Sequence, residues 1–491
     1  MEQRRFHCRA GIFLRGMKAF LFWAAMGAFL LPRPLVADVR VAVDRIWTAD
    51  AGGAIKGQFL PGEVVQYGVS FRVLDPPSGS FSVRLRIMGD GWFEPWEKTV
   101  VGFGPHEVTW KEDAKGASLR TSADACEGKV AIHLDIGWED PERQERIEIQ
   151  GKRHAYFLIS CAAGGFPQRL IKHVQVGESP YDMALTADSR FLYVTCKEGR
   201  SIFVVRTDAP FEVVAQISDP DKIGEPTGIT LAANRTDMLV ADYTLQKIHI
   251  LDTITHQLKD SKSIEGEFGR VKMGDLVLNP LRNELYVCDL AGSRILAING
   301  QNFSPEVFPL SFPDPSGDFF GLNPFKILVD PQGSHLFALC LALGELMKVD
   351  LSPMNRGQVV AAAKGLAIPS SSMVFGADRQ DLYVVTGEDI KPLESGTWSS
   401  IRILDIGNLL LKRTYYFGPY VWDLIIRPDR RFAYGIDSFR GQLVIVDLET
   451  GKELRSCAVE VGYGGRILLA DPRNNRILIG AWSPGAVEIV E

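Results

Sequence analysis

From residue 168 onward, apolar runs of about five or six residues alternate with short polar turns, and the same order returns about seven times. The segments 179–196, 273–289 and 420–437 show the unit clearly: an apolar strand, a turn such as TADSR, NPLRN or RPDRR, and a second apolar strand. A third strand follows in each unit (SIFVV, RILAI and QLVIV are examples), and then a fourth, more polar one. Short apolar runs bounded by turn residues predict β-strands.

The repeats can be aligned on the residue that opens the first strand of each unit. These opening residues are Asp182, Gly228, Asp275, Lys326, Ser372, Asp423 and Arg466. The intervals between them are 46, 47, 51, 46, 51 and 43 residues. Four strands at this period, with no helical pattern, are typical of the blades of a β-propeller.

The two ends of the repeat region predict how the ring closes. The last unit stops after its third strand, AVEIV, while the segment 168–177 is a strand that belongs to no unit. A closed ring leaves no blade with an unpaired face, so this early strand is expected to complete the last blade. We therefore predict a seven-bladed propeller over residues 164–491, closed by strand 168–177.

Residues 38–163 show a different pattern, with about seven short strands of alternating polarity and no helical period. Turn signals such as PPSG and GDG separate these strands. This number of short strands predicts an immunoglobulin-like β-sandwich. The chain as a whole is thus predicted to be all-β, with a β-sandwich domain preceding the propeller.

The first 37 residues have the composition of an export signal. Basic residues precede the apolar run AFLFWAAMGAFLLP, and small residues end at Ala37. The run is shorter than the roughly 20 residues that span a bilayer, so we predict a cleaved signal peptide over 1–37 rather than an anchor. We expect the protein to be periplasmic or secreted, with no membrane span after signal cleavage.

Charge adds to this picture. Cleavage would remove six Lys/Arg and one Glu, which changes the formal charge from −6 to −11. An acidic exported protein is a poor partner for nucleic acid, and we expect none. The predicted partners are a small molecule or an envelope or extracellular protein.

Export makes disulfides chemically accessible. Cys126 and Cys161 lie in the first domain and are predicted either to pair with each other or to remain two buried thiols. The cysteines at 196, 288, 340 and 457 lie in strand patterns and are expected to be small core residues. None of the six has the spacing of a metal site.

The segment SPYDMALTADSRFLYVTC also resembles a known repeat. Tyr193, Val194 and Thr195 match the first three letters of the YVTN-type repeat of bacterial exported seven-bladed propellers, while Cys196 stands where the repeat has Asn. Asp242, Asp289 and Asp437 take that fourth position in other blades and can cap the following turn as Asn does. The resemblance implies a propeller scaffold and leaves function open, because such scaffolds host many activities.

Candidate chemistry gathers where the inner strands begin, since these residues should surround one mouth of the central channel. We predict a polar ligand pocket in which the two cations grip an anionic group, while the aspartates bind hydroxyls, an amine or a metal ion; the alternative is a set of salt bridges without a ligand. Aromatic side chains from neighbouring positions and from the long loop of blade five are expected to form its rim. The candidate ligand-binding residues are Asp182, Asp275, Lys326, Ser372, Asp423, Arg466, Tyr181, Phe325, Trp398 and Trp422.

Motifs of enzymes are mostly missing from the sequence. It contains no G-x-S-x-G, no P-loop, no CxxCH and no paired histidine ligands. We therefore predict a non-catalytic binding or scaffold protein, with no catalytic residues, no metal site and no cofactor, although calcium at the mouth carboxylates is an open alternative. The alternative function is a propeller enzyme, either a metal-dependent lactonase or lyase-like hydrolase or a subunit of an amine dehydrogenase-type oxidoreductase.

Overall fold

The computed structural model describes residues 40–61, 63–74, 82–89, 96–101, 105–110, 119–120, 128–139, 146–161, 165–264, 269–292, 294–310, 323–341, 344–376, 379–390, 397–417, 420–427 and 431–491. The predicted signal segment 1–37 and Cys126 lie outside the described residues. Within the described part of the chain, no helix is long and apolar enough to cross a membrane.

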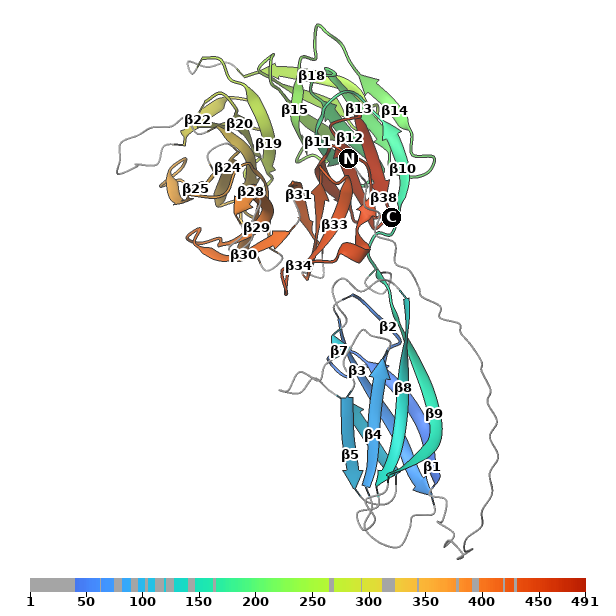
Figure 1. Cartoon of the computed structure of the whole chain (residues 1–491). Coiled ribbons are helices and arrows are strands. Elements are labelled where there is room, and N and C mark those ends of the chain that lie inside the picture. The colour runs from blue at the N-terminus through green and yellow to red at the C-terminus, as the bar shows by residue number, and fades with distance from the viewer. Residues whose placement is uncertain are drawn as a thin grey trace, which may run out of the picture.

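Seven small antiparallel sheets follow one another around a ring in the carboxyl-terminal two thirds of the chain (Figure 1). The first three blades are β11 (Pro180–Leu185), β12 (Phe191–Cys196), β13 (Ser201–Arg206) and β14 (Val213–Ile217); β15 (Pro226–Leu231), β16 (Asp237–Asp242), β17 (Lys247–Asp252) and β18 (Gln257–Ser263); and β19 (Met273–Asn279), β20 (Glu284–Asp289), β21 (Arg294–Asn299) and β22 (Pro305–Pro309). The next two are β23 (Pro324–Val329), β24 (His335–Cys340), β25 (Glu345–Asp350) and β26 (Val359–Ala363); and β27 (Ser370–Phe375), β28 (Asp381–Ile390), β29 (Thr397–Asp405) and β30 (Leu411–Phe417).

Blade six contains β31 (Val421–Ile426), β32 (Phe432–Asp437) and β33 (Gln442–Asp447), whose outer edge pairs with two short strands, β34 (Lys452–Glu453) and β35 (Val459–Glu460). A 3-10 helix, Arg455–Cys457, joins these two strands. Blade seven contains β36 (Gly465–Asp471), β37 (Arg476–Ala481) and β38 (Ala486–Val490). Its outermost strand is β10 (Leu170–Gln175), which pairs antiparallel with β38.

Burial of apolar side chains between neighbouring sheets holds the ring together. The second strand of most blades is buried on both faces, as in β16, β24 and β32. A hydrophobic cluster lies between each pair of neighbouring sheets, and the one between blades one and two contains Tyr193 and Met238. Each inner strand contacts the next, and β36 contacts β11, so the ring closes. Burial of this kind explains why nearly uninterrupted apolar runs mark the second strands in the sequence.

The described strands of the preceding domain form two sheets (Figure 1). One contains β1 (Arg40–Ala49), β3 (Val64–Leu74) and β6 (Pro105–Trp110), with β7 (Leu119–Arg120) paired to β3. The other contains β2 (Gln58–Phe59), β9 (Arg146–Ile159), β8 (Gly128–Glu139), β4 (Ser82–Gly89) and β5 (Trp96–Val101), in this order. The prediction of an all-β chain with a β-sandwich before a seven-bladed propeller is confirmed; the immunoglobulin-like assignment of the sandwich stays a prediction.

The disulfide differs from the expected one. Cys161 pairs with Cys457, 296 residues away, with 5.5 Å between the Cα atoms. The sequence-based pairing of Cys161 with Cys126 is therefore wrong. Cys457 is a buried core residue as expected, but it is a disulfide partner rather than a free thiol. Sequence proximity within one domain misled the pairing, because the segment after β9 packs against the outer edge of blade six. Phe166 shows this packing, with its ring centroid 4.9 Å from that of Phe432.

The remaining described cysteines, at positions 196, 288 and 340, are free and buried, which confirms their expected role as core residues. Burial raises the pKa of the Cys196 and Cys340 thiols to about 12. A thiol that stays protonated is a poor nucleophile.

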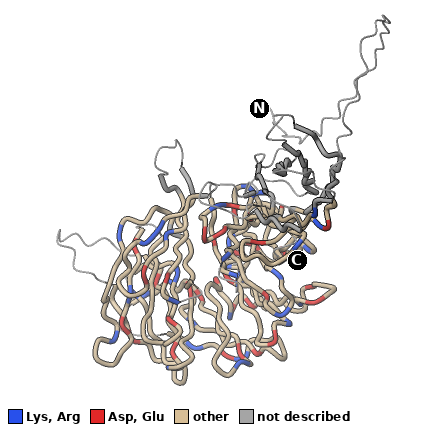
Figure 2. The backbone as a smooth tube through the Cα atoms, turned by 90° about the horizontal axis from the view of Figure 1, so that it is seen from below, with Lys and Arg blue, Asp and Glu red and all other residues tan. Residues whose placement is uncertain are grey.

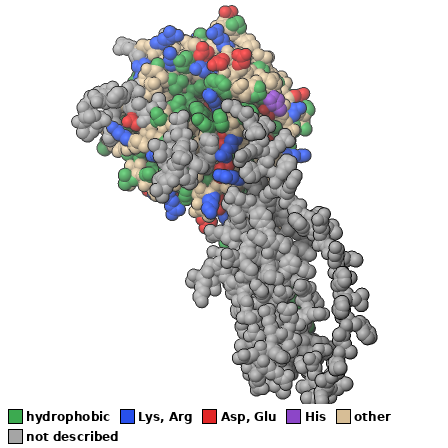
Figure 3. Space-filling view, in the orientation of Figure 1, with side chains coloured by type: hydrophobic (Ala, Val, Ile, Leu, Met, Phe, Trp, Pro, Cys, Tyr) green, Lys and Arg blue, Asp and Glu red, His purple; other side chains and the backbone are tan. Residues whose placement is uncertain are grey.

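The surface of the propeller carries mixed charges. Lys and Arg alternate with Asp and Glu around the ring (Figure 2), and the visible face interleaves hydrophobic and charged side chains (Figure 3). A mixed surface of this kind has no broad field of one sign that would attract a polyanion. Because the outer surface of the described residues has no broad patch of one sign, the channel mouth is the better candidate for a polar binding site.

Candidate functional site

The inner strands share an irregularity at the mouth of the channel. In blade one, Pro180 pairs with Cys196 and Asp182 with Thr195, so that Tyr181 is an extra residue in the ladder. The same register shift occurs at the start of all seven inner strands. A β-bulge of this type redirects a side chain at the end of a strand.

The bulges define two rows of residues around the mouth. The bulge row holds the residue that follows the first paired residue of each inner strand and consists of Tyr181, Thr227, Gly274, Phe325, Ser371, Trp422 and Arg466. The anchor row holds the next residue and consists of Asp182, Gly228, Asp275, Lys326, Ser372, Asp423 and Ile467.

The register corrects the alignment of the last blade. Gly465 pairs with Ala481 and Ile467 with Gly480, so Ile467 occupies the anchor position and Arg466 belongs to the bulge row. The turn DPRNN starts four residues after Ile467, just as TADSR starts four residues after Asp182. The anchor of blade seven is therefore the apolar Ile467 rather than Arg466, which the sequence alignment placed there.

A cavity of about 210 Å³ opens where the two rows meet, and nine of the ten predicted residues line it. The tenth, Trp398, lies in β29, and its side chain is outside the described part of the structure. The lining residues that the sequence analysis did not name are Pro180, Leu341, Ser371, Ile467 and Trp482. Leu341 and Trp482 each follow the last residue of a second strand, so this repeat position could have identified them.

The three anchor aspartates bind backbone groups of the following blade. The carboxylate of Asp182 accepts from the Ile229 amide at 3.0 Å, that of Asp275 from the Ile327 amide at 2.9 Å, and that of Asp423 from the Leu468 amide at 2.7 Å. Charge-assisted bonds of this type join one sheet to the next. The anchor aspartates thus connect blade one to two, three to four, and six to seven.

The carboxylates make further contacts, some within their own strand and some with the anchor residue of a neighbouring blade. Asp182 also accepts from the Met183 amide at 2.9 Å, and Asp423 from the Leu424 amide at 2.8 Å. The Ser372 hydroxyl donates to the same Asp423 oxygen as Leu424. Asp275 forms an ion pair with Lys326, with 3.3 Å between Oδ1 and Nζ. The expectation of salt bridging at the mouth therefore holds for this one pair.

Burial and the neighbouring charges shift the pKa values of the mouth residues. Burial raises the pKa of Asp182 to about 6, although Lys326 opposes this shift and Asp275 adds to it. Burial also raises the pKa of Asp423, again opposed by Lys326. For Lys326 itself, burial lowers the pKa, but the nearby carboxylates Asp275, Asp182 and Asp423 outweigh burial and raise it overall. Lys326 therefore stays charged.

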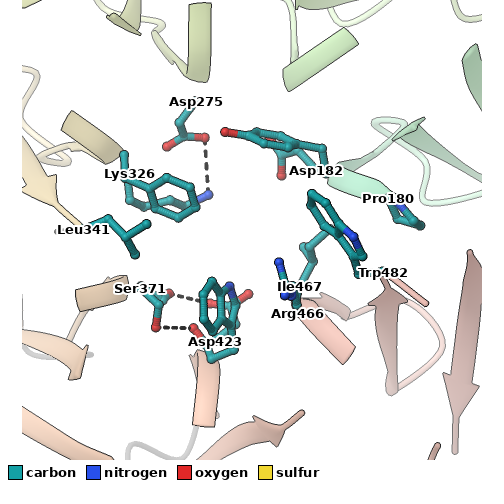
Figure 4. A pocket seen from close by; sticks show the side chains of 14 residues that line it. Pro180, Asp182, Asp275, Lys326, Leu341, Ser371, Asp423, Arg466, Ile467 and Trp482 are labelled. Atoms are coloured by element: carbon teal, nitrogen blue, oxygen red, sulfur yellow. Dashed lines mark hydrogen bonds and ion pairs between the residues drawn. The ribbon is translucent and has the colours of Figure 1, made fainter. Parts of the chain in front are cut away.

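Two bulge-row side chains, those of Arg466 and Tyr181, make no hydrogen bond within the described part of the chain. The Arg466 guanidinium carbon lies 4.8 Å from the ring centroid of Trp422 and 4.6 Å from that of Trp482. Among the described residues, Arg466 has no hydrogen-bond acceptor and no ion-pair partner, and burial lowers its pKa. The buried hydroxyl oxygen of Tyr181 has no hydrogen-bond partner within the described part of the chain. Figure 4 shows Lys326 and Arg466 reaching toward the opening from opposite sides.

The mouth does not resemble a built metal centre. Within the described residues, no group of three or more His, Cys, Asp or Glu side chains is arranged to hold a metal ion. The anchor aspartates direct their oxygens at backbone amides of different blades, so the carboxylates do not converge on one point.

A buried Asp–His–Ser arrangement in blade two does not line the mouth cavity. His249 Nε2 is 3.0 Å from the Asp242 carboxylate, and His249 Nδ1 is 2.8 Å from the Ser261 hydroxyl. Both His249 and Asp242 are fully buried, and Asp242 also accepts from the Leu245 amide at 2.8 Å. Asp242 thus caps the turn after its strand, as predicted from the repeat, and the arrangement locks blade two rather than facing a cavity.

No protein-family model and no curated protein sequence matches the chain. Among solved structures, the chain is similar to Kuenenia stuttgartiensis hydrazine synthase, with 12% identity, a TM-score of 0.51, and coverage of 65% of this chain and 98% of that one. It is also similar to the β-propeller domain of Myceliophteria thermophila Cps50 (Swd1), with 12% identity, a TM-score of 0.52, and coverage of 66% and 99%. Identities this low establish the fold alone, and the resemblance to the YVTN-type repeat stays a prediction. In fold, the chain is a β-propeller protein.

Proposed function

We propose that this chain is a binding protein whose propeller recognises a small polar molecule at the channel mouth. The observation that carries the proposal is that two polar groups lining the cavity have no hydrogen-bond partner among the described residues. They are the buried hydroxyl of Tyr181 and the guanidinium of Arg466, which stacks on two indole rings. Leaving the buried Tyr181 hydroxyl unpaired costs about 1–3 kcal/mol. The half-buried guanidinium of Arg466 also has no acceptor among the described residues, and a ligand that supplies acceptors is the simplest reason to keep both groups.

The shape and chemistry of the cavity support the same function. Its walls combine aromatic side chains with a few charged groups, which is the usual composition of a small-molecule site. Its volume of about 210 Å³ suits a small metabolite better than a large cofactor. Both rows line the cavity, and the aspartates of the anchor row also join the blades whose strands carry these side chains.

A ligand screen by thermal unfolding tests this proposal. A ligand that binds only the folded protein raises its midpoint, so we expect some small polar metabolites to stabilise the wild type and not the Arg466→Ala variant. Arg190→Ala is the matched control, because Arg190 is exposed in the turn between β11 and β12. Compounds that stabilise both variants equally, or a library without any stabilising compound, would contradict the proposal.

We further propose that the protein works in the periplasm or outside the cell. The disulfide between Cys161 and Cys457 supports this location, since such bonds persist in oxidising compartments. Mass spectrometry of the natively expressed protein without reduction should recover the two cysteines in one cross-linked peptide and an amino terminus near residue 38. Reduced cysteines together with an intact residue 1 would argue for a cytoplasmic protein.

A protein partner is a second candidate, because three aromatic side chains are exposed beside the mouth. Tyr420, Phe439 and Tyr463 are 43%, 66% and 71% exposed. Backbone hydrogen bonds link Ser438 to Tyr420 and Gly464, which brings these residues together. A Phe439→Ser, Tyr463→Ser double variant should lose a docking partner in a cross-linking experiment on intact cells while keeping its small-molecule response. Unchanged cross-links would remove this candidate.

A further inference from the structure

The charges that line the mouth cavity do not pair completely. Lys326 and Asp275 form the ion pair described above. Within the described residues, Arg466 has no anionic partner, and Asp182 has no cation within ion-pair distance, although both line the same cavity. One uncommitted cation and one uncommitted carboxylate are complementary to a ligand that carries both signs.

The surroundings of Arg466 favour a carboxylate. Two indole rings flank the guanidinium, which holds it in place while its N–H groups stay available. A planar guanidinium matches a carboxylate with two parallel hydrogen bonds, and fixing it beforehand reduces the entropy lost on binding. The nearest anchor residue, Ile467, is apolar and offers no competing acceptor.

Asp182 is the better of the two candidate carboxylates for an ammonium group. Each of its oxygens accepts one hydrogen bond, from Met183 or from Ile229, and each can accept another. In Asp423, one oxygen already accepts from both Leu424 and Ser372. Asp182 therefore has the greater remaining capacity.

Resting on the proposed binding function, we propose that the cavity takes a small zwitterion of the amino-acid class, with its carboxylate on Arg466 and its ammonium group on Asp182. The remainder of the ligand packs against the apolar and aromatic walls, which include Phe325, Leu341 and Trp482. The cavity of about 210 Å³ limits that remainder to a short side chain. Lys326 and Asp275 form an ion pair, so they leave no net charge of their own for the ligand to match.

Matched sets of three compounds test the two ends of the ligand separately. The first set is L-alanine, ethylamine and propanoate; the second is L-leucine, 3-methylbutylamine and 4-methylpentanoate; the third is L-phenylalanine, 2-phenylethylamine and 3-phenylpropanoate. We expect the amino acid of at least one set to bind in calorimetry at least about tenfold more tightly than its amine and its acid, since each loses one charge-assisted contact.

Two variants assign the contacts. Arg466→Gln and Asp182→Asn should each weaken binding of that amino acid at least about tenfold, and Arg190→Ala should leave it unchanged. The Arg466→Gln variant keeps the anchor row intact, so its unfolding midpoint should match that of the wild type even if Asp182→Asn is less stable. If Arg466→Gln weakens binding of the amine as much as binding of the amino acid, Arg466 does not bind the carboxylate end and the proposal is overturned.

The pH dependence separates a zwitterion from a simple acid. The groups that face Asp182 are Asp275, Lys326 and Tyr181, with Asp423 and Arg466 across the cavity. Because the pKa of Asp182 is raised to about 6, the amino acid should bind more weakly as pH falls from 7 to 5, while the ionised form of a simple carboxylate should bind more tightly. Both charges of an amino acid persist over this range.

The outcomes distinguish this inference from the proposed function. Binding of the acid as tight as that of the amino acid, or a pH dependence of the opposite sign, overturns the zwitterion and leaves a small-molecule site. If none of the nine compounds binds while the thermal screen yields ligands that depend on Arg466, the inference also falls and the binding function stands. If no screened compound binds either, both fall.

Discussion

The anchor row and the bulge row occupy neighbouring positions on the same seven strands, yet their polar side chains serve different purposes. The aspartates of the anchor row accept hydrogen bonds from backbone amides of the next blade. In the bulge row, Tyr181 and Arg466 lie against the cavity, and neither has a hydrogen-bond partner within the described chain. The anchor row thus serves mainly to join the blades, and Asp182, which also lines the cavity, is the one anchor residue proposed to add a ligand contact to that role.

The difference shows why a ring of charged residues is weak evidence for a binding site by itself. A propeller must join its blades at the mouth, and a carboxylate that bridges two backbones does so with strong, directional bonds. Such a group is buried and charged for reasons of architecture. The functional signal lies in the polar groups that the architecture leaves unsatisfied.

The largest expected effect comes from removing an anchor aspartate. Asp423→Ala leaves the amides of Leu424 and Leu468 and the hydroxyl of Ser372 without their acceptor. We expect the free energy of unfolding in urea to fall by about 2–4 kcal/mol, because each unsatisfied buried group costs about 1–3 kcal/mol and removal of a buried charge offsets part of this.

Two matched variants frame that measurement. Ser372→Ala removes one bond to the same carboxylate and should cost about 1 kcal/mol. Asp221→Ala removes an exposed carboxylate and should be neutral within about 0.5 kcal/mol. A neutral Asp423→Ala variant would show that the anchor row does not join the blades and would remove the contrast between the rows.

The repeat made the fold predictable from the sequence. Each blade repeats one pattern of apolar strands and turns, so the register of one blade supports that of the next. The same pattern identified nine lining residues, because the start of an inner strand can be read from the apolar run that follows it. Cys457 was not predictable in this way, since its pairing with Cys161 depends on how the sandwich packs against blade six.

The different roles of the anchor row and the bulge row could not be predicted from the sequence. A β-bulge leaves no reliable mark in a single sequence, so Arg466 was aligned with the anchors although it occupies a bulge. The indole rings that flank it come from β31 and from the residue after β37, and only the closed ring brings them together. Which polar groups already have hydrogen-bond partners likewise depends on three-dimensional contacts, so it could not be predicted from the sequence.

A smaller effect should appear in the pH dependence of stability. Because the pKa of Asp182 is about 6 in the folded protein and 3.8 in its ordinary state, the folded protein holds a proton on this group between these values. The stability that Asp182 contributes is therefore complete below about pH 4 and is lost as pH rises through about 6.

Comparison with Asp182→Asn isolates this contribution. The difference in unfolding free energy, wild type minus variant, should be larger at pH 4 than at pH 7 by about 2 kcal/mol, since one pKa unit corresponds to about 1.4 kcal/mol. Urea titrations at both pH values provide the measurement. A difference that stays constant with pH would mean that the pKa of Asp182 is the same in the folded and the unfolded protein, as it is for an exposed carboxylate.

The smallest expected effect on stability comes from the bulge row itself. Arg466→Ala removes a half-buried guanidinium that contacts two indole rings and, among the described residues, no acceptor, so the unfolding free energy should change by no more than about 1 kcal/mol. Removing the charge relieves a desolvation cost, which the lowered pKa of Arg466 reflects, and this gain opposes the lost stacking. A loss as large as that of Asp423→Ala, measured in the same urea titration, would place Arg466 in the architecture rather than in the binding site. Near-wild-type stability together with loss of the ligand response would separate the two rows by function.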